Sequence, residues 1–175
     1  MATTYTLISS VTVGSGGAAN ISFTSIPQTY TDLYLIFSAR VDTTIGDPYY
    51  NCYLLTNAYP LDGGGKTRYL LGNGSSASSA NDGNNILLLG ITSSGATSNT
   101  FGSTSAYFTN YASTSQYKSV SIDQVSENNA TASATMLSDG LYPANTAITS
   151  ITIETFSTGN FVQHSTAYLY GISNA

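Results

Sequence analysis

Charge is scarce in this 175-residue chain, because charged residues make up 7% of it where a typical globular protein has about 25%. Only four residues are basic, namely Arg40, Lys66, Arg68 and Lys118. Lys and Arg supply much of the affinity for nucleic-acid phosphates and for anionic membranes. The composition therefore predicts neither a nucleic-acid partner nor a membrane partner.

The chain has one cysteine, one histidine and no tryptophan. The single cysteine, Cys52, excludes an intrachain disulfide and a multi-cysteine metal site, and its place in the strand-like YYNCYLL favours a small buried hydrophobe over a reactive thiol. A catalytic triad would have to use His164, but no G-x-S-x-G motif marks a serine for it. We interpret His164 as a polar residue at the start of the last strand.

Long hydrophobic runs are also absent, since no stretch approaches the roughly 18 apolar residues of a membrane span. No basic residue precedes Arg40, and no apolar run marks a signal peptide near the N-terminus. We therefore expect a soluble protein that is not exported by a signal peptide.

The stretch LDGGGKTRY, residues 61–69, ends like the phosphate-binding loop G-x-x-x-x-G-K-[ST]. Where that motif requires its first glycine the chain has Pro60, which has no backbone N–H for a phosphate. The following RYLLGNGSSASS has no helical period, whereas a phosphate loop opens a helix. We interpret the stretch as a glycine-rich turn.

Short runs of β-branched and aromatic residues, separated by Gly, Pro, Asn, Asp and Ser, predict an all-β chain. In Leu33–Val41 the odd positions are apolar and the even positions include Ser38 and Arg40, which is typical of a half-buried antiparallel strand. Ile151 and Ile153 alternate with polar residues in the same way. The predicted strands cover residues 5–13, 19–23, 33–41, 49–56, 68–71, 86–91, 105–111, 117–124, 131–137, 148–156 and 165–172.

No segment shows a sustained helical stripe, so we expect little or no helix. About ten strands in a single domain over residues 1–175 predict an antiparallel two-sheet sandwich of jelly-roll or related Greek-key topology. The region 42–85, rich in Gly, Asn and Tyr, is predicted to be loop-rich with short strands, and TSSGATSNTFGST from Thr92 is predicted to be a second exposed loop. Because so few lysines can blunt the sheet edges, we expect partner subunits to cover the edges and apolar patches.

Four loop carboxylates are candidates for the paired acids of glycoside hydrolysis, but nothing in their spacing singles out a pair: they are Asp42, Asp47, Asp62 and Asp82. VDTTIGDPYYN and SANDGNN offer oxygen ligands for calcium, but against the loop pattern D-x-[DN]-x-[DN]-G, Asp82 and Asn84 match while Ile86 does not. A bound cation remains an alternative. We predict no catalytic residue, no metal and no cofactor.

Tyrosine is the most distinctive residue, with 14 copies. Its flat apolar ring with a polar tip suits both sandwich cores and contact surfaces. Tyr107, Tyr168 and Tyr170 lie in predicted strands, where we expect core or sheet-face positions. Four tyrosines of the loop-rich region are the predicted partner contacts: Tyr49, Tyr50, Tyr59 and Tyr69.

The run SIPQTYTDLYLIFSARVD (residues 25–42), with the opening TYTLISSVTVG and the ending STAYLYGI, resembles small virion proteins of tailed bacteriophages, particularly those of marine and freshwater bacteria including cyanobacteria. The resemblance covers both ends of the chain and leaves out residues 47–104. It implies a structural protein with no catalytic residues. Similar sequences occur as capsid decoration (cement) proteins and as modules of tail fibres or head fibres.

Two functions follow from the resemblance. A decoration protein would be a homotrimer that binds the major capsid protein on the capsid surface, and would assemble in the bacterial cytoplasm. A fibre module would contact host polysaccharide through region 42–85. An enzyme such as a depolymerase rests only on the loop carboxylates.

Overall fold

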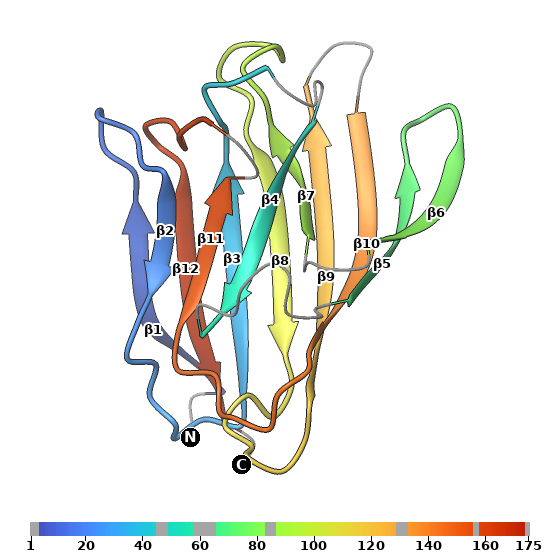
Figure 1. Cartoon of the computed structure of the whole chain (residues 1–175). Coiled ribbons are helices and arrows are strands. Elements are labelled where there is room, and N and C mark those ends of the chain that lie inside the picture. Colours follow the sequence, from blue (N-terminus) through green and yellow to red (C-terminus); the bar gives the residue numbers. More distant parts are fainter. Residues whose placement is uncertain are drawn as a thin grey trace.

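The computed structural model describes residues 4–44, 49–57, 66–82, 87–128, 133–155 and 158–173. Every regular element in these ranges is a β-strand, and the strands form two antiparallel sheets packed as a sandwich (Figure 1). The described residues include no helix with the length and apolarity needed to span a membrane. The structure thus confirms the predicted all-β sandwich.

The larger sheet has eight strands in the order β1-β12-β3-β8-β9-β10-β5-β6. Their bounds are Tyr5–Thr12 (β1), Thr166–Ile172 (β12), Asp32–Ala39 (β3), Gly102–Phe108 (β8), Lys118–Glu127 (β9), Ser133–Tyr142 (β10), Lys66–Gly72 (β5) and Ala77–Asp82 (β6). The smaller sheet has four strands in the order β2-β11-β4-β7. Their bounds are Asn20–Phe23 (β2), Ile151–Thr155 (β11), Tyr49–Thr56 (β4) and Leu87–Thr92 (β7).

Buried and exposed residues alternate along the strands, and the buried ones form a core between the two sheets. In β9 every second residue is buried, so that Val120 and Ile122 face the small sheet while Ser121 and Asp123 face solvent. Leu33, Leu35, Phe37, Ala39 and Val41 are buried as their spacing predicts, and so are Ile151 and Ile153. Burying a Val, Leu, Ile or Phe side chain contributes about 1.5–3 kcal/mol, and this sum decides which face of each strand turns inward.

The small sheet does not extend over the whole large sheet. Figure 1 shows β5 and β6 reaching past it on one side of the molecule. The inner side of β5 belongs to a separate small cluster, in which Tyr69 and Leu71 pack with the buried Tyr53 and Met136. The β5–β6 hairpin therefore depends on its pairing with β10 and on this cluster.

In the described part of region 42–85, the predicted strands 49–56 and 68–71 are present as β4 and β5, and β6 is an additional strand. β6 was not predicted, because ASSAND has no aromatic or β-branched residue. Its strand conformation comes from pairing with β5, from Gly72 opposite Ala77 to Thr67 opposite Asp82. Such tertiary context outweighs intrinsic strand propensity.

Two of the four basic residues hold loops inside the fold. The Arg40 guanidinium donates hydrogen bonds to the carbonyl oxygens of Ser94, Ala96, Thr97 and Thr100, which organises the loop that follows β7. The segment 93–101 between β7 and β8 is thus a loop, as predicted, but Ser93 and Ala96 within it are buried rather than exposed.

Lys118 is fully buried and donates from Nζ to the carbonyl oxygens of Ala144 (3.1 Å) and Thr146 (2.6 Å). Its ammonium also lies 5.6 Å from the ring centre of Tyr142. Burial away from water lowers the pKa of Lys118. The Lys118 ammonium therefore holds the loop after β10 through these carbonyl oxygens and is not available to a partner.

Residues of the run SIPQTYT contact segments from the second half of the chain. The Gln28 Nε2 donates to the carbonyl oxygens of Ile26 (2.8 Å) and Ile148 (3.1 Å). The ring of Tyr30 lies where a Cβ on Gly171 would be, so only glycine fits in that part of β12. This part of the run is structural, since its side chains connect loops of the sandwich.

Candidate interaction surface

The face of the large sheet that points away from the small sheet, here called the outer face, is the candidate functional site. It is formed by the residues that alternate with core positions, such as Tyr34 and Ile36 on β3 and Asp123 and Val125 on β9. Among the described residues, the exposed large hydrophobic side chains are Tyr5, Leu7, Ile36, Leu70, Tyr117, Val125 and Leu137. Six of these lie in strands of the outer face, and Tyr117 directly precedes β9.

One end of the outer face is aromatic. Strand pairing places Leu7, Tyr170, Tyr34 and Tyr107 in a row across β1, β12, β3 and β8. The ring centre of Tyr34 lies 6.2 Å from that of Tyr5 and 6.3 Å from that of Tyr107, both within the range of favourable aromatic pairs. Half-buried tyrosines thus form a continuous flat surface here, with Tyr168 beside them. The sheet-face positions predicted for Tyr107, Tyr168 and Tyr170 are confirmed.

Asp32 anchors this aromatic row. Its Oδ2 accepts a 2.7 Å hydrogen bond from the Tyr107 hydroxyl, and its Oδ1 accepts one of 2.7 Å from the backbone N–H of Asn110. The hydrogen bond to Asp32, together with burial and the carboxylate charge, raises the pKa of Tyr107 to about 12. The Tyr107 ring is therefore fixed in place before any partner arrives.

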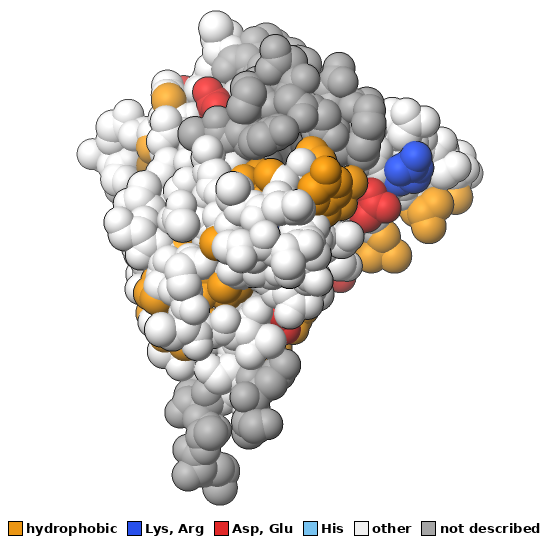
Figure 2. Space-filling model, turned by 60° about the horizontal axis from the view of Figure 1, so that its bottom comes forward, with side chains coloured by type: hydrophobic (Ala, Val, Ile, Leu, Met, Phe, Trp, Pro, Cys, Tyr) orange, Lys and Arg blue, Asp and Glu red, His pale blue; other side chains and the backbone are white. Residues whose placement is uncertain are grey.

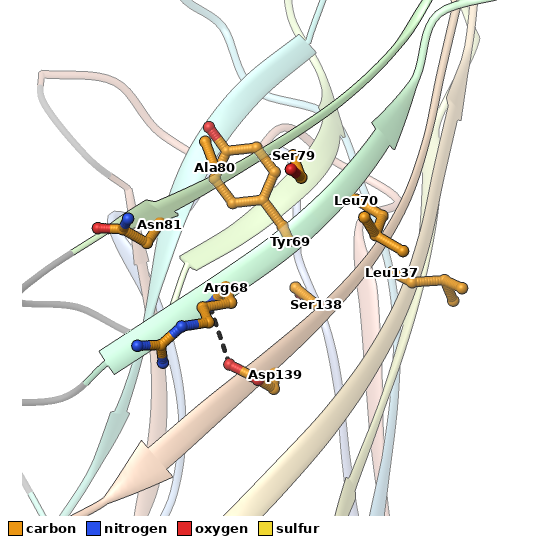
Figure 3. Close-up of a pocket in the computed structure, with 9 residues that line it drawn as sticks. All are labelled: Arg68, Tyr69, Leu70, Ser79, Ala80, Asn81, Leu137, Ser138 and Asp139. Carbon is orange, nitrogen blue, oxygen red and sulfur yellow. Dashed lines mark hydrogen bonds between the residues drawn. The ribbon is translucent and has the colours of Figure 1, made fainter.

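The other end of the outer face lies on β10, β5 and β6, and it combines apolar and charged groups. Leu137 and Leu70 are directly opposite each other, and Asp139 is opposite Arg68. The Asp139 Oδ1 accepts a 2.8 Å hydrogen bond from the backbone N–H of Arg68 (Figure 3). In Figure 2, hydrophobic side chains gather beside a basic and an acidic side chain, on the side of the molecule where β5 and β6 lie in Figure 1.

Two shallow hollows flank these leucines. The Arg68 hollow, of about 560 Å³, is lined by residues that include Arg68, Leu70, Ser79, Asn81, Leu137 and Asp139 (Figure 3). The Gly72 hollow, of about 480 Å³, is lined by residues that include Leu70, Gly72, Ala77, Thr135 and Leu137. Both are open depressions, so this end of the face is shaped to receive side chains of another molecule rather than to enclose a small ligand.

The predicted contact tyrosines are not brought together as a site by the described residues. Tyr69 is half-buried and packs inward beside Met136. The backbones of Tyr49 and Tyr50 belong to β4, opposite Thr92 and Ile91, and their side chains lie outside the described part. Tyr59 also lies outside the described residues.

The neighbours of Tyr69 are the residues that sequence reasoning missed. In the run Tyr69-Leu70-Leu71 apolar side chains point to both faces of β5, and Leu70 is the exposed one. This lack of alternation could have indicated a partner-binding strand, because a strand with one solvated face normally carries polar residues on that face.

The candidate chemistry of the loops is not assembled in the described residues. The Asp42 carboxylate accepts hydrogen bonds from the backbone N–H (2.7 Å) and the side-chain Nδ2 (3.3 Å) of Asn160, so it links the segment after β3 to the loop before β12. Asp47 and Asp62 lie outside the described part, as does the side chain of Asp82. Within the described ranges no three His, Cys, Asp or Glu side chains form a group that could hold a metal ion.

The remaining sequence candidates have structural positions. Cys52 is fully buried in β4, and burial raises the pKa of its thiol, as expected for a small hydrophobe. His164 is exposed in a turn at φ 75° just before β12. Residues 61–65 lie outside the described part, and Lys66 begins strand β5, where a phosphate-binding loop would require a helix.

Comparisons of this protein with protein-family models, with curated proteins and with solved structures find no match.

Proposed function

We propose that this protein is a non-enzymatic virion structural protein, a capsid decoration (cement) protein that attaches to the shell through the outer face of its large sheet. The observation that carries the proposal is the outer face itself, an uncovered sheet with Leu70 and Leu137 exposed at 60% and 56%. Soluble monomers rarely expose contiguous apolar patches above roughly a few hundred Å² unless a partner covers them.

The chemistry of this face suits a broad protein surface. One end of the face carries the tyrosine row, in which Asp32 holds Tyr107. The other end carries apolar side chains on β10 and β5. Aromatic and aliphatic groups that are already ordered lose little entropy on binding, so many modest contacts can add up. Arg40 and Lys118 are engaged within the fold, and attachment would therefore depend on shape and apolar contact more than on basic charge.

The step from a binding face to a virion rests on the resemblance of residues 25–42 and of the two chain ends to small phage virion proteins. The partner on this proposal is the major capsid protein, and the protein acts on the capsid surface as a homotrimer. Symmetric copies on a shell multiply weak contacts without any chemistry. Loss of the protein is expected to leave particles that form normally but lyse at lower temperature.

The test is cryo-electron microscopy of purified particles, combined with rebinding of the protein to shells that lack it. Density repeated over capsid-subunit junctions, with the outer face toward the shell, is the expected result. The double variant Leu70→Ser, Leu137→Ser is expected to lose at least ten-fold in shell affinity. Tyr117→Ser is the matched control, because Tyr117 is as exposed as Leu137 (both 56%) but precedes β9, well along the sheet from Asp123, which pairs with Leu137. Density confined to tails or fibres, or equal binding by all three proteins, would overturn the proposal.

The tyrosine row favours a second candidate, a fibre module that binds host glycans. Tyr5, Tyr34 and Tyr107 present neighbouring rings on which sugar faces could stack. A glycan array separates the two functions, because a decoration protein has no sugar preference. Selective binding that is lost in Tyr34→Ala would support the fibre module.

A further inference from the structure

The two edge strands of the large sheet, β1 and β6, differ in how readily a further strand could pair with them. The β1 edge is interrupted, because its register with β12 shifts between Leu7 and Ser9. The β6 edge pairs with β5 over its whole length without a shift, from Ala77 to Asp82. Natural proteins blunt such edges with lysine, proline, bulges or a covering element. The β6 sequence ASSAND has no lysine and no proline.

The outward backbone groups of β6 are free in the described part of the chain. β6 is the terminal strand of its sheet, and among the described residues it pairs with β5 alone. The side chains of residues 77–81 are small or short: two alanines, two serines and one asparagine. Another strand can therefore approach to the usual spacing of about 4.8 Å without displacing a bulky group.

We propose that β6 pairs antiparallel with β6 of a second copy of this protein, about a two-fold axis perpendicular to the sheet. The occupant is a second copy because two identical antiparallel strands are self-complementary, so that each contact on one side of the axis is repeated on the other. A register centred on Ser79 pairs all residues from 77 to 81 with the partner strand and places Ala77 opposite the partner's Asn81. It also keeps both outer faces on the same side of the joined sheet, since residues two apart share a face.

The Gly72 hollow supplies complementary shape across this axis. Gly72 lies opposite Ala77, and Arg68 lies opposite Asn81. The row across the joined sheet therefore runs from Gly72 to Ala77, then to the partner's Asn81 and the partner's Arg68. Two strand spacings, about 10 Å, separate Ala77 from the partner's Arg68, so the long side chain can extend toward Ala77 at the rim of the hollow.

Charges favour the same arrangement. At the axis the facing residues are Ser79 and Ser79 of the partner subunit, and they are neutral. Each Arg68 is accompanied by Asp139 of its own chain, directly opposite on β10. Two copies thus meet without like charges near the axis, and each Arg68 extends toward the apolar rim of the partner's hollow. The inference goes beyond the proposed attachment to a shell and does not depend on it.

The test is the particle mass of the intact protein, measured by sedimentation velocity and native mass spectrometry, with circular dichroism to confirm folding. Ser79→Lys places two positive charges at the axis and is expected to halve the mass of the particle that the β6 contact joins. Ser79→Glu is expected to do the same. An equimolar mixture of the two variants is expected to restore the wild-type mass, because opposite charges then face each other.

Thr12→Lys is the matched control, because Thr12 is exposed on β1 at the opposite edge of the same sheet. Its mass is expected to equal that of the wild type. Equal masses for wild type and Ser79→Lys, a failure of the mixture to restore the mass, or a halved mass in Thr12→Lys would each overturn the β6 contact. Shell binding is scored separately, so a Ser79→Lys protein that still binds shells leaves the proposed function standing.

Discussion

Leu137 on β10 lies directly opposite Leu70 on β5, and both side chains are more than half exposed, at 56% and 60%. Two leucines paired in this way on a solvated sheet face contribute little to folding, because most of their surface stays in water. Substitutions at these two leucines can therefore test binding to a partner with little effect on the stability of the fold.

We predict that Leu70→Ser and Leu137→Ser each change the free energy of unfolding by no more than about 0.5 kcal/mol. Leu35→Ala is the contrast, because Leu35 is fully buried in β3, and its loss is expected to cost about 2–5 kcal/mol. Urea unfolding followed by tyrosine fluorescence measures both. A cost above 2 kcal/mol for either surface variant would mean that these leucines belong to the fold.

Asn57 is predicted to be among the most sensitive polar positions. At φ 54° its Oδ1 accepts from the backbone N–H groups of Thr149 (2.7 Å) and Ser150 (3.1 Å), and its Nδ2 donates to the Ala147 carbonyl (2.7 Å) and the Tyr142 hydroxyl (3.1 Å). Asn57→Ala loses all of these bonds and also strains the backbone, so we expect a cost of about 3 kcal/mol.

Asn57→Gly loses the same hydrogen bonds but tolerates the positive φ. It is therefore expected to cost about 1 kcal/mol less than Asn57→Ala in the same urea experiment. If glycine were the more damaging of the two, the backbone conformation at this position would carry no strain.

Alternation in the sequence predicted which side chains of the central strands face the core. Leu33, Leu35 and Phe37 of β3 are buried as expected, because burial of one face fixes the register of a strand with period two. The same pattern carries no information on how far the small sheet extends. Whether a face is covered depends on long-range packing, and for this reason the open face over β10 and β5 was not predicted.

Tyr69 also shows that the sequence alone does not decide which face of a strand is covered. Tyr69 was expected to face a partner, yet it packs inward with Met136, while its neighbour Leu70 points outward. Both faces of Tyr69-Leu70-Leu71 are apolar, so the sequence cannot decide the orientation. The register with β10, which places Leu70 opposite Leu137, decides it.

Gly171 is predicted to tolerate no side chain. A Cβ there would overlap Cγ and Cδ2 of the Tyr30 ring, so Gly171→Ala is expected to destabilise the fold by about 1–3 kcal/mol. Gly14→Ala is the control, because its Cβ would meet no atom within 4 Å. In a Tyr30→Ser background the cost of Gly171→Ala is expected to fall, and a double-mutant cycle by thermal unfolding measures this coupling. Additive effects would show that Tyr30 is not the obstacle.

The Tyr107–Asp32 hydrogen bond is predicted to make stability depend on alkaline pH. The pKa of Tyr107 is raised from 10.0 to about 12 in the folded protein. As pH rises above 10, the unfolded chain loses this proton first, so unfolding becomes more favourable. The stabilisation is fully present below pH 10 and is lost as pH rises through about 12.

Urea unfolding between pH 9 and pH 12 tests this, alongside ultraviolet titration of the tyrosinate band. Tyr107→Phe has no proton to lose at this position, so its stability is expected to fall less steeply over that range than that of the wild type. Asp32→Asn removes the carboxylate whose hydrogen bond and charge raise the pKa, and Tyr107 should then titrate closer to 10.0. Parallel stability curves for wild type and Tyr107→Phe would mean that the bond to Asp32 does not hold the aromatic row in solution, because a retained bond must couple folding to that proton.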